Sequence, residues 1–151
     1  MSLESRIMDE LKTAMKAKDE ASLRTLRAIK AAILVEKTAE GATGELTEAD
    51  ELKLVQKLAK QRRDSLDIYV KQNREDLAAT EREELAILER FLPQQLSGEQ
   101  LRAELQAIIA QVGAAGPADM GKVMGTASKA LAGRAEGKAI SETVKSLLTG
   151  Q

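Results

Sequence analysis

Hydrophobic residues recur at helical spacing through the first part of the chain. They follow one another every three or four positions, with polar residues between them, at Leu3, Ile7, Leu11, Met15 and then at Leu23, Leu26, Ile29, Ile33. This period places each set of side chains on one face of a helix. It therefore predicts two amphipathic helices, over residues 3–17 and 20–37.

A short break separates these helices from a second pair. Two glycines interrupt the period within residues 38–46, and Thr47 followed by Asp50 is typical of a helix N-cap. A long third helix is predicted from there to about Gln72, where Asn73 can adopt the left-handed conformation that ends a helix. The fourth predicted helix carries the apolar residues Leu77, Leu85, Leu88 and Leu92.

Pro93 marks the clearest boundary in the chain. Proline cannot continue a helix, and it biases Leu92 away from helical backbone angles. A chain of 151 residues is long enough for a two-part arrangement. We therefore expect an N-terminal helical domain over residues 1–95 and a smaller C-terminal domain over residues 96–151.

Three shorter helices are predicted after this boundary. Ser97 and Gln100 match a capping box at the start of the first, and Gly113 can end it. Pro117 suits the first turn of the second, which Gly133 can close. The three apolar stripes are Leu101, Leu105, Ile108, Val112, then Met120, Val123, Met124, Ala127, Leu131, and finally Ile140, Val144, Leu147, Leu148. No segment predicts a strand, so the expected fold class is all-α, with three helices in the C-terminal domain.

The composition fits helices and narrows the range of partners. Only Tyr69 and Phe91 are aromatic, which leaves little for stacking on exposed bases. The 23 basic and 24 acidic residues give a net charge of −1, so no overall field attracts the chain to nucleic acid or to an anionic membrane. No apolar run approaches the roughly 18 residues that span a bilayer, and no signal-peptide pattern is present. We expect a cytoplasmic protein with no membrane or DNA partner.

The residue types exclude several kinds of chemistry. The chain has no histidine and no cysteine, so the usual general base, thiolate nucleophile and soft zinc ligands are lacking. We predict no catalytic residue, no metal site and no cofactor. Carboxylates cluster at Glu81, Glu83 and Glu84, but basic residues are interleaved with them. We interpret this run as a solvated helix face with ion pairs between residues one turn apart.

Two glycines stand inside the helix that follows Pro117. Residues 116–123 imitate the spacing of a phosphate-binding P-loop, but Val123 stands where that loop needs Ser or Thr, and no strand precedes it. Gly121 and Gly125 lie four residues apart, on one helix face, where another group can approach closely. Each costs about 1 kcal/mol relative to alanine in a helix. Tight packing of a neighbouring helix and contact with a partner are both open explanations.

Basic residues gather near these glycines. Residues 117–151 contain five basic residues against three acidic ones. Arg134 and Lys138 lie in a glycine-containing corner, residues 133–138, where backbone N–H groups and a helix N-terminus can meet phosphates. Two rows spaced by three form basic ridges on the N-terminal helices, at Arg24, Arg27, Lys30 and at Lys57, Lys60, Arg63. A solvated face explains most rows of this kind, and phosphate contact is the alternative.

Motifs in both parts of the chain resemble YqeY-like proteins. They are Asp119-Met120-Gly121-Lys122-Val123-Met124-Gly125, Gly133-Arg134-Ala135-Glu136-Gly137-Lys138, Leu23-Arg24-Thr25-Leu26-Arg27, Lys60-Gln61-Arg62-Arg63-Asp64-Ser65 and Phe91-Leu92-Pro93. The C-terminal domain of that family is related to the tail of the B subunit of tRNA-dependent amidotransferase (GatB), which contacts the outer corner of tRNA. The resemblance implies a tRNA-facing domain without an attached active site. The resemblance implies that the glycines of the family motif correspond to Gly121, Gly125, Gly133 and Gly137. The charged residues beside them are Lys122, Arg134 and Lys138.

The resemblance favours a non-catalytic adaptor that binds tRNA, linked to tRNA-dependent amidation, while the N-terminal domain engages a protein partner. The candidate residues for nucleic-acid contact are Lys122, Lys129, Arg134 and Lys138. One alternative is a protein-interaction module without RNA binding, in which the stripe Met120, Met124 and Leu131 docks a partner helix. A third hypothesis is an accessory to carbon–nitrogen ligase activity with glutamine as amido-N-donor. Salt dependence separates the first two, because phosphate contacts weaken steeply as salt rises.

Overall fold

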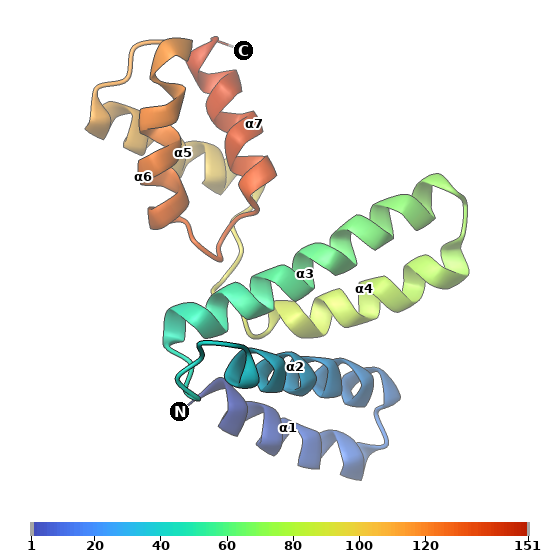
Figure 1. Cartoon of the computed structure of the whole chain (residues 1–151). Helices are drawn as coiled ribbons and strands as arrows, with labels where there is room; N and C mark the ends of the chain where they lie inside the picture. Colours follow the sequence, from blue (N-terminus) through green and yellow to red (C-terminus); the bar gives the residue numbers. More distant parts are fainter. Residues whose placement is uncertain (1, 151) are drawn as a thin grey trace. The chain divides into compact units, whose positions relative to one another are not determined.

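The computed structural model describes residues 2–150 and contains helices but no strand in that range, which confirms the all-α prediction (Figure 1). The helices are α1 (Leu3–Ala17), α2 (Glu20–Thr38), α3 (Glu48–Lys71), α4 (Glu75–Glu89), α5 (Gly98–Val112), the short 3-10 helix η1 (Pro117–Asp119), α6 (Met120–Ala130) and α7 (Gly137–Leu148). Two compact units divide between Leu92 and Pro93, and we describe each by itself as unit 1 and unit 2. The assignment of two domains at 1–95 and 96–151 stays a prediction.

The helix ends are made by the residues that the sequence singled out. The Thr47 hydroxyl accepts a hydrogen bond from the Asp50 N–H at 3.1 Å, and the Asp50 carboxylate accepts one from the Thr47 N–H at 3.0 Å. Ser97 and Gln100 form the same reciprocal box at the start of α5. Asn73 adopts the expected left-handed conformation, with φ 57°. These local signals were sufficient because each cap satisfies backbone groups that the first or last helical turn leaves unpaired.

Unit 1 consists of two helix hairpins packed together. In Figure 1, α1 and α2 run side by side, as do α3 and α4, and α2 contacts both helices of the second pair. The shared core is aliphatic apart from one ring, and its largest fully buried members include Ile7, Leu26, Ile29, Val55 and Leu88. Phe91 completes it, with the Arg6 guanidinium 4.9 Å from the ring centroid. The apolar stripes predicted from the sequence are therefore the faces that meet in this core.

A charged network lies beside this core, and it corrects the interpretation of the glutamate run as a solvated face. Only 8% of Glu84 is exposed. Its two carboxylate oxygens lie 3.5 Å from Arg24 Nε and 3.6 Å from Arg62 Nε. Glu81 Oε2 lies 4.0 Å from the same Arg62 nitrogen. The run spans two environments, because Glu83 remains largely exposed and, among residues 2–150, pairs with Arg24 alone.

Burial and charge crowding act on Glu81 in this network. Partial burial raises its pKa above the usual value, and the nearby Glu84 carboxylate adds to the rise, while Arg62 and Arg24 oppose it. Glu81 Oε2 and Arg62 Nε are buried and make no hydrogen bond within residues 2–150. Helix periodicity could not reveal this network, since its members come from α2, α3 and α4 and meet only when the hairpins pack.

Unit 2 is a three-helix arrangement in which α5, α6 and α7 contact one another pairwise. Its core is wholly aliphatic and includes Leu105, Val123, Leu131 and Val144, each 1% exposed or less. Met120 and Met124 pack against the same core. The hypothesis that the stripe Met120, Met124 and Leu131 docks a partner helix is wrong for Leu131, which is 1% exposed, while Met120 and Met124 are half-buried against the same core.

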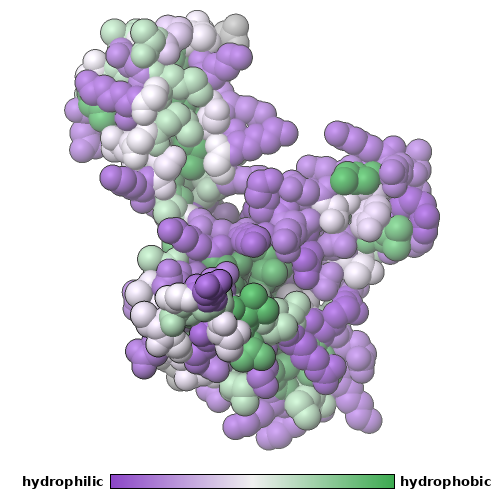
Figure 2. All heavy atoms as spheres, viewed as in Figure 1, coloured by the Kyte–Doolittle hydropathy of each residue, from purple (hydrophilic) through white to green (hydrophobic). Residues whose placement is uncertain are grey.

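The face of the molecule in Figure 2 is largely hydrophilic, with hydrophobic atoms exposed at a few places. No helix among the described residues is long and apolar enough to cross a membrane.

Candidate nucleic-acid interface

Helix α6 has one buried face and one open face. Val123 and Ala127 are fully buried on the first. The opposite side carries a shallow groove lined by Gly121, Lys122, Gly125, Thr126, Lys129 and Ala130, with a volume of about 610 Å³. These residues recur at helical spacing, so they form one continuous strip along the helix. We refer to this strip as the glycine–lysine face.

The two glycines on this face are not explained by packing inside the protein. A Cβ atom added at Gly121 or at Gly125 would have no neighbouring atom within 4 Å. Neither backbone conformation is left-handed, so the helix itself would accept alanine at both positions. The interpretation as an internal close-packing device is therefore wrong. The glycines leave open space at this face, at a cost of about 1 kcal/mol each in helix propensity.

The lysines beside these glycines are available to a ligand. Lys122 and Lys129 are exposed and lie seven residues apart, two turns along the same side of α6. Neither forms an ion pair with any of residues 2–150. Two ammonium groups without an ion-pair partner among these residues, beside two glycines that carry no side chain, are suited to a polyanion whose backbone must come close to the helix.

The corner that follows α6 holds the other four predicted residues. Gly133 is buried with φ 77°, and its carbonyl accepts a hydrogen bond from the Gln95 side chain. The Arg134 carbonyl accepts another from the Leu96 N–H at 2.9 Å. Gly133 is thus accounted for by the left-handed turn that ties α6 to the segment before α5. No close approach of a ligand is needed to explain it.

Lys138 and Gly137 occupy the first turn of α7. Both are exposed, and the N-cap residue Glu136 makes no side-chain hydrogen bond to the helix end. Arg134 is half-buried, and neither it nor Lys138 lines the groove on α6. The structure therefore brings together four of the eight predicted residues, Gly121, Lys122, Gly125 and Lys129. The other four belong to the adjoining turn and helix start.

The P-loop-like segment has a different geometry from a phosphate-binding loop. Pro117–Asp119 forms η1, and Gly121 and Lys122 already lie inside α6. The Asp119 carboxylate accepts a hydrogen bond from the Ala115 N–H at 2.9 Å, which closes the turn. Because no strand precedes the segment within the described residues, the sequence-based rejection of a P-loop is supported.

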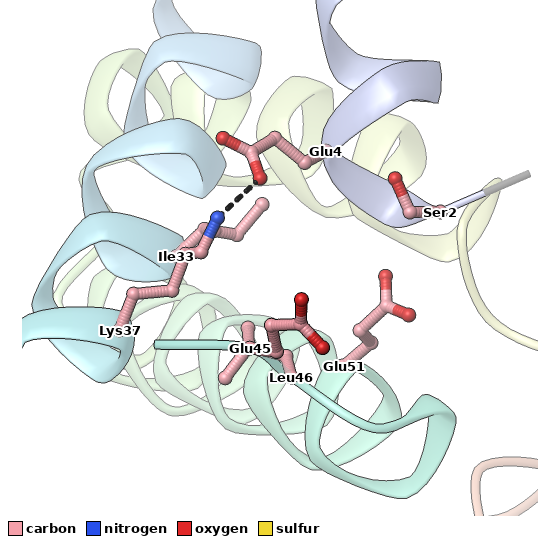
Figure 3. A pocket seen from close by; sticks show the side chains of 7 residues that line it. All are labelled: Ser2, Glu4, Ile33, Lys37, Glu45, Leu46 and Glu51. Atoms are coloured by element: carbon pink, nitrogen blue, oxygen red, sulfur yellow. Dashed lines mark hydrogen bonds and ion pairs between the residues drawn. The ribbon is translucent and has the colours of Figure 1, made fainter. Parts of the chain in front are cut away.

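A polar pocket of about 300 Å³ lies in unit 1, where the chain start meets α2 and the segment leading into α3 (Figure 3). Lys37 Nζ pairs with Glu4 Oε2 at 2.7 Å, and Glu51 Oε2 accepts a hydrogen bond from the Leu3 N–H at 2.5 Å. In Figure 3 the Glu45 carboxylate points into the same opening. Two of these three carboxylates already bind groups of the chain itself, and the described residues hold no cluster of acidic groups suited to a metal ion.

Some residues of the two basic ridges on the N-terminal helices form ion pairs within unit 1. Arg24 pairs with Glu83 and Glu84, and Arg63 Nη2 lies 3.7 Å from Glu89 Oε1. Arg27 and Lys30 instead line an apolar groove along α2, which sequence reasoning missed. The sequence signal for this groove was the adjacent pair Leu34 and Val35, which lie outside the apolar stripe that forms the buried face of that helix.

A sequence model of one family matches almost the whole chain. The family is described as "Yqey-like protein", and the match covers residues 4–148.

Two yeast proteins are similar to parts of the chain. Both carry the name "Altered inheritance of mitochondria protein 41, mitochondrial". The protein of Meyerozyma guilliermondii is 37% identical over 123 residues, covering 77% of this chain and 61% of its own length. That of Vanderwaltozyma polyspora is 36% identical over 83 residues, covering 55% of this chain and 44% of its own length. The chain thus spans about half the length of these relatives, and the cytoplasmic location expected from its sequence stays a prediction.

Proposed function

The chain belongs to the Yqey-like protein family, and from this premise we propose that it is a non-catalytic adaptor that binds tRNA through the glycine–lysine face of α6. One observation carries the proposal. Among residues 2–150, no atom lies within 4 Å of a Cβ added at either exposed glycine of α6, and the lysines between and beyond the glycines form no ion pair.

The chemistry of this face suits the backbone of a folded RNA. Phosphate and ribose contacts supply most of the affinity for structured RNA and do not require base stacking. Without Cβ atoms at Gly121 and Gly125, a sugar–phosphate strand can approach the helix surface while Lys122 and Lys129 reach phosphates on either side. The only aromatic residues, Tyr69 and Phe91, lie outside this unit. Recognition by shape and charge is therefore the mode that we expect.

Arg134 and Lys138 are the candidates for further phosphate contacts. Arg134 lies in the segment between α6 and α7, and Lys138 lies in the first turn of α7, which adds backbone N–H groups without a side-chain cap. Two to four phosphate contacts predict an affinity no tighter than about 1 μM at physiological salt. A link to tRNA-dependent amidation is part of this proposal, in which the adaptor supplies tRNA binding and another protein supplies the chemistry.

The test is fluorescence anisotropy of labelled, folded tRNA titrated with the whole chain at about 50 and about 200 mM salt. The test variant is Lys122→Ala with Lys129→Ala. The matched control is Lys12→Ala with Lys16→Ala, which removes the same charge from exposed positions of α1. We expect salt-sensitive binding that the test variant weakens at least about tenfold and the control leaves within about twofold.

Three outcomes would contradict the proposal. They are absence of binding at the lower salt concentration, equal loss in both variants, and binding that salt does not weaken. The last result would favour a protein helix as the occupant of the glycine–lysine face, since small residues also allow close helix contact. Release of ammonia from glutamine by the pure protein would instead support the carbon–nitrogen ligase hypothesis.

A further inference from the structure

We propose that the outer side of α2 is a docking groove for an acidic amphipathic helix of a partner protein. The groove has a volume of about 550 Å³, and its lining includes Arg27, Lys30, Ala31, Leu34 and Lys37 of α2 together with Glu4 and Gly44. This inference specifies the protein-partner side of the adaptor proposed above. It does not require RNA, and the two can fail separately.

The shape of the groove follows from the period of α2. Its core face carries Leu26, Ile29 and Ile33, which are almost completely buried. The groove residues are spaced at the same helical interval but rotated toward solvent, from Arg27 to Thr38. Eleven steps of about 1.5 Å give a length of about 16 Å, which matches a partner helix of about three turns.

The floor of the groove is apolar and uncovered within the described residues. Leu34 is 61% exposed, and its neighbour Val35 is 65% exposed. Figure 2 shows strongly hydrophobic atoms at the surface over the C-terminal half of α2, with hydrophilic atoms around them. Adjacent exposed aliphatic side chains at the edge of a groove favour an apolar anchor from a partner, because burying each one removes its apolar surface from water.

The rim of the groove determines the charge of the partner. Arg27 and Lys30 are exposed and form no ion pair with any of residues 2–150. Lys37 at the far end is already paired with Glu4. Two free cations beside an apolar floor complement a helix that carries carboxylates on either side of a leucine stripe. A basic helix would meet like charge at the same rim.

The test uses a fluorescein-labelled synthetic helix of about 14 residues, with leucines every third or fourth residue and flanking glutamates. A second peptide has lysine in place of each glutamate. Both are titrated into the whole chain and into two variants, Leu34→Glu and Ile68→Glu. Ile68 is a matched control because it is an aliphatic residue 52% exposed on α3, outside the groove. Circular dichroism of both variants confirms that each remains folded.

We expect the glutamate peptide to bind at least about tenfold more tightly than the lysine peptide, a difference of about 1.4 kcal/mol. Leu34→Glu should weaken that binding at least about tenfold, whereas Ile68→Glu should change it less than about twofold. In a parallel tRNA titration, Leu34→Glu should retain the wild-type affinity within about twofold, so that a failure of this inference is distinct from a failure of the RNA proposal.

Equal binding of the two peptides, or an equal effect of both variants, would overturn the inference. So would the absence of binding of the glutamate peptide at concentrations up to about 1 mM, which corresponds to a binding free energy of about −4 kcal/mol. Self-association that Leu34→Glu abolishes would assign the groove to a second copy of the chain. Binding to vesicles of anionic phospholipid that is lost in Leu34→Glu would assign it to a membrane surface, and either result would replace the partner helix.

Discussion

The two units contain similar helix-forming residues but differ in where their cations find partners. In unit 1, Arg24 and Arg62 converge on the buried Glu84, and ion pairs join α1 to α2, α3 to α4, and α1 to the residue after α4. In unit 2, Lys122 and Lys129 project from a helix face that nothing in the described chain covers. Unit 1 thus uses several of its cations in ion pairs that join its helices, whereas Lys122 and Lys129 of unit 2 form no ion pair with any of residues 2–150.

This difference shows why the net charge of −1 is a poor guide to function. Charges that are neutralised by neighbours contribute little to the field that a ligand meets, whereas a few unpaired cations on an open face act at short range. The near-neutral total therefore weighs less against polyanion binding than composition suggests. Each of the predictions below changes one unit in a way that should leave the other unaffected.

The largest expected effect is on the buried network of unit 1. Glu84→Gln removes the negative charge that both Arg24 and Arg62 face and should lower the free energy of unfolding by about 2 to 3 kcal/mol. Urea unfolding followed by Tyr69 fluorescence measures this, because Tyr69 lies in unit 1. The control Glu83→Gln alters an exposed partner of Arg24 and should cost less than about 1 kcal/mol. Similar losses in the two variants would show that the network is not structural.

The next effect should occur in unit 2 with the opposite sign. Gly121→Ala and Gly125→Ala should each raise the free energy of unfolding by up to about 1 kcal/mol, because alanine is the better helix former and its Cβ meets no atom. The same changes should weaken tRNA binding. Circular dichroism during urea unfolding and the anisotropy titration measure the two properties. Gly113→Ala is the control, and it should destabilise the protein, since φ at Gly113 is 70°. Stabilised variants with unchanged tRNA affinity would remove the functional reason for these glycines.

Equal losses of stability are expected at the two capping boxes, one of which lies in each unit. Thr47→Ala at the start of α3 and Ser97→Ala at the start of α5 each delete one side of a capping box. Each change should cost about 1 kcal/mol. Thermal unfolding followed by circular dichroism compares them, with Thr13→Ala, an exposed mid-helix change in α1, as the control. A cost confined to one of the two caps would show that the units differ in local as well as tertiary stability.

The smallest effect concerns pH. Because the pKa of Glu81 is higher in the folded protein than in the unfolded chain, its contribution to stability is complete at low pH and is lost as pH rises through the folded pKa. The Glu81→Gln variant has no titrating group at this position and so does not lose this stability as pH rises. The free energy of unfolding of the variant, relative to that of the wild type, should therefore increase between about pH 4 and about pH 7. Urea unfolding at several pH values measures this difference. A difference that is constant or decreases with pH would contradict the burial of this carboxylate.

The local features of the fold could be predicted from the sequence because each depends on residues close in the chain. Helical periods, both capping boxes and the left-handed Asn73 are of this kind. The burial of Glu84 could not be predicted, since it depends on Arg62 arriving from another helix of the folded unit. Leu131 was misread for a related reason. Periodicity shows that a residue lies on an apolar face but not whether that face meets the protein's own core.

The candidate site could be predicted only in part from the sequence, for the same reason. Sequence identified the glycines of α6 but left their environment open, and only the structure shows that Gly121 and Gly125 face outward while Gly133 serves a turn. The groove along α2 was missed because Leu34 and Val35 sit in a helix whose core stripe was already complete. Exposed apolar residues of this kind are distinguished from core residues only by tertiary packing.

The most direct test of the central claim is a map of backbone amide shifts in isotopically labelled protein as folded tRNA is added. We expect the amides of Gly121, Lys122, Gly125 and Lys129 to shift or broaden first, while those of unit 1 remain unchanged. Glycine amides at the interface are direct reporters, since no side chain separates them from the ligand. Perturbations confined to unit 1, or absent from α6, would contradict the assignment of this face to RNA.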